Sequence, residues 1–118
     1  GIRDSSVTGV QTCALPILTP EGKQKAKVKK ILDDLGCYYF FPAANGYGRS
    51  SIPDIIVCMD GLFLGLEIKA GKNKATALQL RELDRIRQHG GLGLVVDDNN
   101  IDTLEHVLQH WRSKEWTP

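Results

Sequence analysis

The feature that most constrains the fold is an Asp-Gly pair set between two apolar stretches. Asp60-Gly61 follows Ile52–Met59 and precedes Leu62–Lys69. Asp-Gly between apolar runs is the strongest short-range signal for a hairpin with a two-residue turn, because both residues accept a positive φ. The sequence therefore predicts two antiparallel strands, with Met59 opposite Leu62 at the turn.

Two carboxylates lie opposite each other in this predicted hairpin. Counting away from the turn places Asp54 across from Glu67 on the same face, with Cβ atoms about 5 Å apart. Opposed acids repel, and loss of water strengthens the repulsion, so the pair requires either a proton or a bridging cation. Lys69 follows Glu67 by two residues and points to the same face. The plain alternative is a structural salt bridge between Glu67 and Lys69 at a solvated strand end.

Two acids and a lysine on one face are what metal-assisted phosphodiester cleavage requires. The carboxylates of Asp54 and Glu67 are suited to Mg²⁺ or Mn²⁺, which prefer oxygen ligands. The ammonium of Lys69 can orient or deprotonate an attacking water and balance charge on a phosphate. This pattern predicts a catalytic site on this face of the hairpin.

The rest of the chain predicts an α/β domain. Thr19-Pro20-Glu21 begins a helix with a Thr N-cap, a Pro at the first helical position and an acid in the first turn. Gly36 is suited to end that helix. The expected order is helix Pro20–Leu35, strand Cys37–Phe41, the hairpin, helix Thr76–His89, strand Leu92–Val96 and a last helix that begins near Asn100 or Asp102.

Two further polar residues fall on the predicted inward faces of helices. Glu21 lies within about 20° of Val28 around the first helix, so it points toward the sheet that carries the two acids. Gln79 precedes Leu83 by four residues and lies on the inward stripe of the second helix. Each has a plain explanation, since an acid suits a helix N-terminus and a Gln can cap a loop.

Composition limits the class of protein. Net charge is +1, so nucleic-acid binding would depend on how charge is distributed. No apolar run reaches the length of a membrane span. Three cysteines without paired spacing argue against a disulfide scaffold and against zinc, and favour a reducing compartment. We expect Cys37 and Cys58 to be small core residues, and the three histidines, His89, His106 and His110, to lie on the surface.

Basic and flexible segments near the predicted site are candidates for DNA contact. The Gly-rich loop Asn45–Ser51 precedes Asp54, and a second loop follows Lys69. The lysines of the first helix, Lys23, Lys27 and Lys30, have the spacing of a solvated stripe. The candidate DNA-binding residues are Tyr47, Arg49, Ser50, Lys72 and Lys74.

The first seventeen residues have neither helical periodicity nor strand alternation. Their stretch Val7–Ile17 resembles the translation of a sequencing-library adapter. We therefore expect residues 1–17 to be a non-native or disordered tail, and residues 18–118 to form the domain.

Pro53-Asp54 followed by Glu67-Ile68-Lys69 resembles the PD…ExK signature of the PD-(D/E)XK nuclease superfamily. The segments TPEGKQKAKVKKILDDLG, GYGRSSIPDIIVC, LGLEIKAGKNKATALQLRELDRIRQHGG and LGLVV resemble the VRR-NUC (virus-type replication-repair nuclease) domain of small stand-alone phage proteins. One departure is Ser51, where the family often has Gly. The resemblance implies a restriction-endonuclease-like αβββαβ core with a mixed central sheet, here followed by a C-terminal helix.

The resemblance also implies an activity and roles for residues. It implies an Mg²⁺- or Mn²⁺-dependent DNA endonuclease that acts on branched DNA such as four-way junctions or flaps, in phage replication or repair within the bacterial cytoplasm. Its implied metal ligands are Glu21, Asp54, Glu67 and the backbone carbonyl of Ile68, and its implied catalytic residues are Asp54, Glu67, Lys69 and Gln79.

Stand-alone relatives are associated with homodimers, which makes Trp111 and Trp116 candidates for a dimer face; core packing is the alternative for Trp111. Two other functions stay open at this point. One is a restriction-like or archaeal-type resolvase with another substrate preference. The other is a DNA-structure-binding module that uses the fold without turnover.

Overall fold

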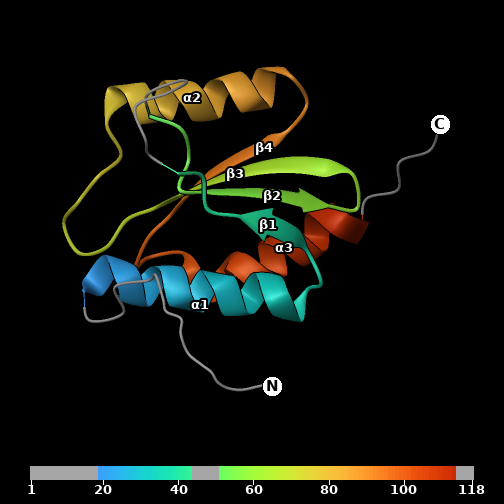
Figure 1. Cartoon of the computed structure of the whole chain (residues 1–118), viewed down its shortest axis with the longest axis horizontal. Helices are drawn as coiled ribbons and strands as arrows, with labels where there is room; N and C mark the ends of the chain where they lie inside the picture. The colour runs from blue at the N-terminus through green and yellow to red at the C-terminus, as the bar shows by residue number, and fades with distance from the viewer. Residues whose placement is uncertain (1–18, 44–50, 114–118) are drawn as a thin grey trace.

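The computed structural model describes residues 19–43 and 51–113 of the chain. Three α-helices, one short 3₁₀ helix and a four-stranded sheet make up this part (Figure 1). Their bounds are α1 Pro20–Asp34, β1 Tyr38–Phe40, β2 Ile55–Met59, β3 Leu62–Ile68, α2 Ala77–Gln88, β4 Leu92–Val96, η1 Ile101–Thr103 and α3 Leu104–Ser113. The predicted order of elements is confirmed.

The sheet is mixed, as the sequence predicts. Its strand order is β1-β2-β3-β4, with β1, β2 and β3 antiparallel in succession and β4 parallel to β3. A parallel pair needs a crossover connection, and α2 provides it between β3 and β4. This is the αβββαβ arrangement expected for the chain, extended by η1 and α3.

The hairpin has the predicted register. Met59 pairs with Leu62 and Ile55 pairs with Leu66. Asp60 and Gly61 have φ values of 53° and 89°, the two positive values that a tight turn between antiparallel strands requires. The strand itself begins later than predicted, at Ile55 rather than Ile52. Pro53 has no N–H to donate to a neighbouring strand, which explains the later start.

Helices cover the two faces of the sheet unequally. In Figure 1, α1 and α3 lie on one side of the sheet and α2 lies on the other. The side chains of β2 and β3 that point toward α1 and α3 form the buried core with them. The core contains Val28, Leu32, Ile55, Val57, Met59, Leu62, Leu64, Leu66, Ile68, Leu92, Val96, Ile101, Leu104 and Leu108. Trp111 is partly buried and packs against this core, which is the alternative to a dimer face that the sequence left open for it.

The face of the sheet against which α2 packs has glycines at the contact, and α2 covers only part of this face. A Cβ on Gly65 would lie 2.5 Å from Ile86 Cδ1, and one on Gly93 would lie 2.7 Å from the carbonyl oxygen of Leu83. Glycine at these positions lets α2 approach β3 and β4 closely. Cys58 is exposed on this side, which corrects the expectation that it belongs to the core. Its side chain alternates with the core residues of β2 and points to the part of the sheet that α2 leaves uncovered.

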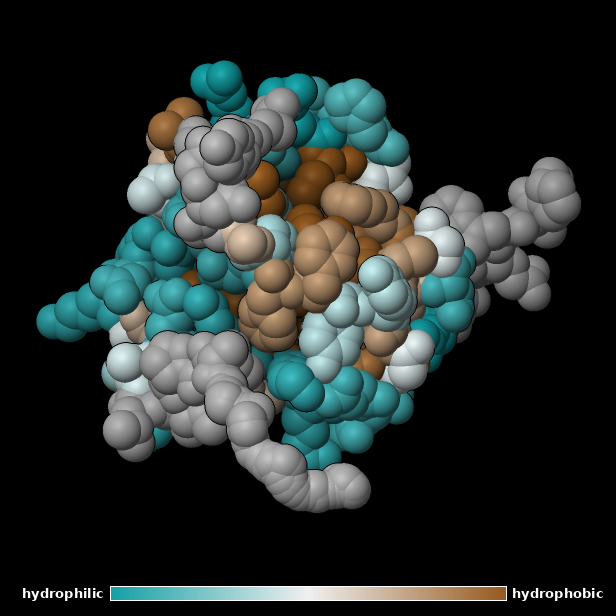
Figure 2. Space-filling view, viewed as in Figure 1, coloured by the Kyte–Doolittle hydropathy of each residue, from teal (hydrophilic) through white to brown (hydrophobic). Residues whose placement is uncertain are grey.

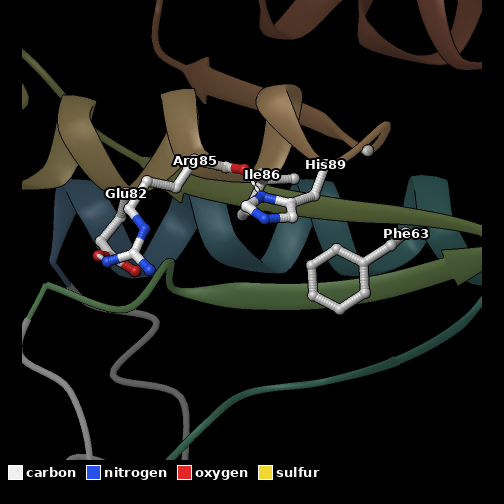
Figure 3. A pocket seen from close by; sticks show the side chains of 6 residues that line it. Phe63, Glu82, Arg85, Ile86 and His89 are labelled. Atoms are coloured by element: carbon white, nitrogen blue, oxygen red, sulfur yellow. Dashed lines mark hydrogen bonds and ion pairs between the residues drawn. The ribbon is translucent and has the colours of Figure 1, made fainter.

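Apolar side chains gather on the surface between α2 and the layer of α1 and α3 (Figure 2). Tyr38, Phe40 and Phe63 have exposed fractions of 71%, 47% and 47%. Beside them is a surface pocket of about 280 Å³, which Figure 3 shows between Phe63 on β3 and the side chains of α2. Its lining residues are Phe63, Glu82, Arg85, Ile86, His89 and Gly91. None of the described helices has the length and apolar character needed to cross a membrane.

Candidate active site

Asp54 and Glu67 meet at the end of the hairpin opposite the turn. Asp54 directly precedes β2, and Glu67 is the last residue but one of β3. The Oδ2 atom of Asp54 accepts a hydrogen bond of 2.8 Å from the backbone N–H of Ile68. This bond fixes the Asp54 carboxylate against the end of β3. The register predicted from the Asp-Gly turn therefore brings these two acids together.

Glu67 is buried, and its two carboxylate oxygens differ in their partners. The Oε2 atom accepts a hydrogen bond of 3.0 Å from Gln79 Nε2 and lies 3.6 Å from Lys69 Nζ. The Oε1 atom is buried and has no hydrogen-bond partner among the described residues. Buried polar atoms are normally paired, so an orphaned carboxylate oxygen marks a position where a ligand is expected.

The environment of Glu67 changes its protonation. The pKa of Glu67 is raised to about 7, chiefly because burial removes water from its charged form. The nearby negative charge of Asp54 contributes to this rise, and the ammonium of Lys69 opposes it. A carboxyl group with a strongly raised pKa beside a second carboxylate is typical of functional sites.

Gln79 has two structural roles at the start of α2. Its Oε1 atom accepts a hydrogen bond from the N–H of Thr76, and the Thr76 hydroxyl accepts one from the N–H of Gln79. This reciprocal capping box fixes the side chain of Gln79. Its Nε2 atom is then free to donate to Glu67. The structure thus shows Gln79 both in the helix cap and in contact with Glu67, and its part in catalysis stays a prediction.

Glu21 lies near the two acids and is joined to them through a lysine. Its Oε2 atom is 3.5 Å from Lys25 Nζ, and the same ammonium is 4.0 Å from Asp54 Oδ1. The Glu21 side chain is 36% exposed, so it is only partly buried, whereas Val28 on the same helix is fully buried. In residues 19–43 and 51–113, no group of three or more His, Cys, Asp or Glu side chains is gathered closely enough to hold a metal ion.

Lys25 and Gln24 are two residues near the site that the sequence analysis missed. Gln24 is 4% exposed, and its Nε2 atom donates a 2.8 Å hydrogen bond to Asp98. Asp98 in turn accepts a 2.9 Å bond from the N–H of Gly71. This chain of bonds ties α1 to the loop after β4 and to the loop that follows Lys69. A polar residue four positions before Val28 on the core stripe was the available signal for Gln24.

The candidate DNA-binding residues fall into two groups. Lys72 and Lys74 are exposed on the loop between β3 and α2, close in sequence to Lys69. Tyr47, Arg49 and Ser50 lie outside the described residues, as do residues 1–17 and Trp116. The three histidines, His89, His106 and His110, are exposed, as expected.

Solved structures provide the comparison with known proteins. A structure described as "VRR_NUC domain" is 29% identical, with a TM-score of 0.64 over 79% of this chain and 98% of that one. A "VRR_NUC domain protein" is 18% identical, with a TM-score of 0.58 over 79% of this chain and 88% of that one. The Holliday junction resolvase Hjc of Archaeoglobus fulgidus is 20% identical, with a TM-score of 0.51 over 64% of this chain and 65% of that one. No protein-family profile and no curated protein matches the chain.

The order of elements and the acids at the open end of the hairpin define a PD-(D/E)XK-type nuclease fold. Within that superfamily, the fold of this chain is that of the VRR_NUC domain. The family resemblance drawn from Pro53-Asp54 and Glu67-Ile68-Lys69 is thereby confirmed.

Proposed function

We propose that the protein is a divalent-metal-dependent DNA endonuclease that hydrolyses phosphodiester bonds. The observation that carries this proposal is the buried Glu67, which lies beside Asp54 and contacts both Lys69 and Gln79. The VRR_NUC fold supports the same conclusion, because this arrangement is at the position where the PD…ExK signature predicts it.

Asp54 and Glu67 are two acids, fewer than a closely gathered group of three in the described residues, and this pair fits a hard divalent cation. The orphaned Oε1 of Glu67 is a buried acceptor, and two acids side by side are stabilised by a cation between them. We assign Asp54, Glu67 and the backbone carbonyl of Ile68 as ligands, with Glu21 as a further ligand directly or through water. When bound, Mg²⁺ or Mn²⁺ would lower the pKa of a water and stabilise charge on the phosphate.

The other side chains position the reacting groups. Gln79 fixes one oxygen of Glu67 through its 3.0 Å hydrogen bond, and so holds the carboxylate in one orientation. Lys69, only 14% exposed on its side chain, is suited to orient or deprotonate the attacking water and to balance phosphate charge. The position of Lys69 beside Glu67 favours catalysis over the alternative of a module that binds DNA without turnover.

Branched DNA is the substrate class that we propose, in phage DNA replication or repair inside a bacterial cell. The Hjc structure is described as a Holliday junction resolvase, and it shares the fold with this chain. Lys72 and Lys74 are suited to contact phosphates beside the site, because both are exposed on the loop after Lys69. A resolvase or restriction-like enzyme with another substrate preference is separated from this proposal by the ranking of substrates.

A homodimer is part of the proposal, because one small domain contacts a short length of DNA. The apolar surface that α2 leaves uncovered, with Tyr38, Phe40 and Phe63, supports it. Sedimentation of the wild-type chain should give twice the 13.0 kDa of one chain. Phe40→Lys should give the single mass, whereas Lys30→Glu on the exposed side of α1 should leave the dimer intact.

The test is cleavage of labelled four-way-junction, flap and linear DNA with Mg²⁺, with Mn²⁺ and with chelator. Asp54→Asn and Lys69→Ala should abolish metal-dependent cutting. Asp60→Asn changes an acid at the opposite end of the same hairpin and serves as the matched control, with unchanged cutting. Binding of DNA by the wild type without cutting in any metal would overturn the enzymatic function.

A further inference from the structure

Helix α1 carries three lysine–acid pairs with the same spacing, and one of them differs from the others. Lys29 pairs with Asp33 at 3.2 Å and Lys30 pairs with Asp34 at 3.1 Å, each four residues apart. The side chains of these two lysines are 47% and 76% exposed, and Asp33 also accepts a 2.7 Å hydrogen bond from the Tyr39 hydroxyl. Such exposed pairs contribute little and are typical of a solvated helix surface.

Lys25 is held in a different environment. Its side chain is 23% exposed, and its ammonium lies between Glu21 on the same helix and Asp54 before β2. The distances are 3.5 Å to Glu21 Oε2 and 4.0 Å to Asp54 Oδ1. Lys25 is therefore the group that connects the acid of α1 with the acids at the end of the sheet.

The charges around the site indicate what this lysine does. Three carboxylates, those of Glu21, Asp54 and Glu67, face the two ammonium groups of Lys25 and Lys69. Without a metal, Lys25 reduces the repulsion between Glu21 and Asp54. A divalent cation among the same acids would leave the cluster with excess positive charge as long as Lys25 stayed in place. The charges balance again when the ammonium moves away.

We propose that Lys25 is the resident cation of the metal site. It neutralises Glu21 and Asp54 in the metal-free protein, and a divalent cation must displace it to reach these oxygens. A lysine is suited to this exchange, because its ammonium is a single strongly hydrated charge on a flexible stem. This inference rests on the metal dependence proposed above and adds a competitor that the metal-binding equilibrium must overcome.

The change in metal affinity when Lys25 is removed distinguishes competition with the metal from a supporting role. Lys25 could help a metal to bind by holding Glu21 near Asp54, and its loss would then weaken binding. The repulsion between the Lys25 ammonium and a divalent ion a few ångströms away is larger than the free energy gained by ordering the Glu21 side chain. Removal of Lys25 should therefore tighten metal binding, by about tenfold.

The test is calorimetric titration of Mn²⁺ into the full chain without DNA. Lys25→Met should bind Mn²⁺ about tenfold more tightly than the wild type, and Lys25→Arg should stay near the wild type because it retains the charge. Lys29→Met, on the same helix with the same spacing to its acid, is the matched control and should leave affinity unchanged. A second readout is thermal unfolding, in which Lys25→Met should unfold earlier in chelator and gain more from added Mg²⁺.

Each outcome decides the proposal. Equal or weaker Mn²⁺ affinity in Lys25→Met overturns the role of resident cation and leaves the metal-dependent nuclease standing. Absence of saturable Mn²⁺ binding in the wild type and in Lys25→Met overturns the metal dependence itself, and the inference with it. An equal gain in Lys29→Met would mean that net charge alone sets the affinity, which also overturns the specific role of Lys25.

Discussion

The two ends of the β2–β3 hairpin carry acids in contrasting environments. At the turn, Asp60 has a side chain that is 66% exposed, and its Oδ2 atom lies 2.9 Å from Arg112 Nε, an ion pair without a well-aligned hydrogen bond. At the open end, the side chain of Glu67 is 3% exposed and has the carboxylate of Asp54 beside it. The same hairpin thus has an exposed acid, Asp60, paired with an arginine at one end. At the other end it has a buried acid, Glu67, beside a second carboxylate.

This difference separates a structural acid from the acid that we propose to be functional. Arg112 also donates a 2.7 Å hydrogen bond to the carbonyl of Leu35, so at the turn end it connects α3, the end of α1 and the hairpin. Burial of Glu67 beside Asp54 opposes stability, because it places a carboxylate that has lost its water next to a like charge. Local choices that oppose stability are expected where function demands them.

The largest expected effect is on cleavage. Glu67→Gln preserves the shape of the side chain and removes its charge, so we expect cleavage to fall by about 10³-fold or more, equivalent to about 4 kcal/mol. Asp60→Asn, the same kind of change at the turn, should leave cleavage within about twofold. Single-turnover rates on a four-way junction measure both. Equal losses of cleavage rate in Glu67→Gln and Asp60→Asn would contradict the assignment of the catalytic acid to the open end of the hairpin.

The second effect is a dependence of stability on pH. The pKa of Glu67 is about 7 in the folded protein and near 4.5 as the ordinary value. The folded state therefore binds this proton more tightly, so the contribution of Glu67 to stability decreases as pH rises from about 4.5 to 7. The loss amounts to roughly 3 kcal/mol above pH 7.

Urea unfolding in chelator at several pH values between 4 and 8 measures this loss. Glu67→Gln cannot titrate at this position, so its stability relative to the wild type should increase with pH across the same range. Asp60→Asn keeps Glu67 and serves as the control that retains the pH dependence caused by Glu67. If the free energies of unfolding of the wild type and Glu67→Gln differ by the same amount from pH 4 to pH 8, the raised pKa of Glu67 is contradicted.

Loss of the Gln79 amide should have an intermediate effect. Gln79→Leu removes the hydrogen bond to Glu67 and half of the capping box, which should cost about 1–2 kcal/mol of stability and lower cleavage by about tenfold. Thr76→Ala removes the other half of the same cap and keeps Gln79, so it should lower stability by about 1 kcal/mol with a smaller effect on cleavage. Equal activity in the two variants would mean that Gln79 acts through the cap alone.

The smallest effect concerns the backbone on either side of residues 52–59, the segment that contains β2. Ser51 and Asp60 have φ values of 64° and 53°, in the left-handed region that favours glycine. Asp tolerates this region better than Ser, so Ser51→Gly should stabilise the protein by about 0.5 kcal/mol, whereas Asp60→Gly should give no gain. Thermal unfolding of the wild type, Ser51→Gly and Asp60→Gly in the same buffer measures these differences in stability. Destabilisation by Ser51→Gly would show that the hydroxyl makes a contribution larger than the backbone strain.

The sequence by itself determined the parts that depend on neighbours along the chain. Thr19 and Thr76 act as the N-caps of α1 and α2, and the Asp60-Gly61 turn sets the register that brings Asp54 toward Glu67. These features are set by a few consecutive residues, because a cap or a tight turn needs a particular backbone conformation at each position. The predicted order of helices and strands was correct for the same reason.

The tertiary structure alone decided which of these polar groups lose water and what they contact. The burial of Glu67, the position of Lys25 between Glu21 and Asp54, and the exposure of Cys58 all depend on how α1 and α2 pack on the sheet. Burial and ion pairing join segments that are remote in the chain, so periodicity within one segment does not reveal them. The sequence therefore predicted the acids and their register, and the packing of helices on opposite faces of the sheet buried Glu67.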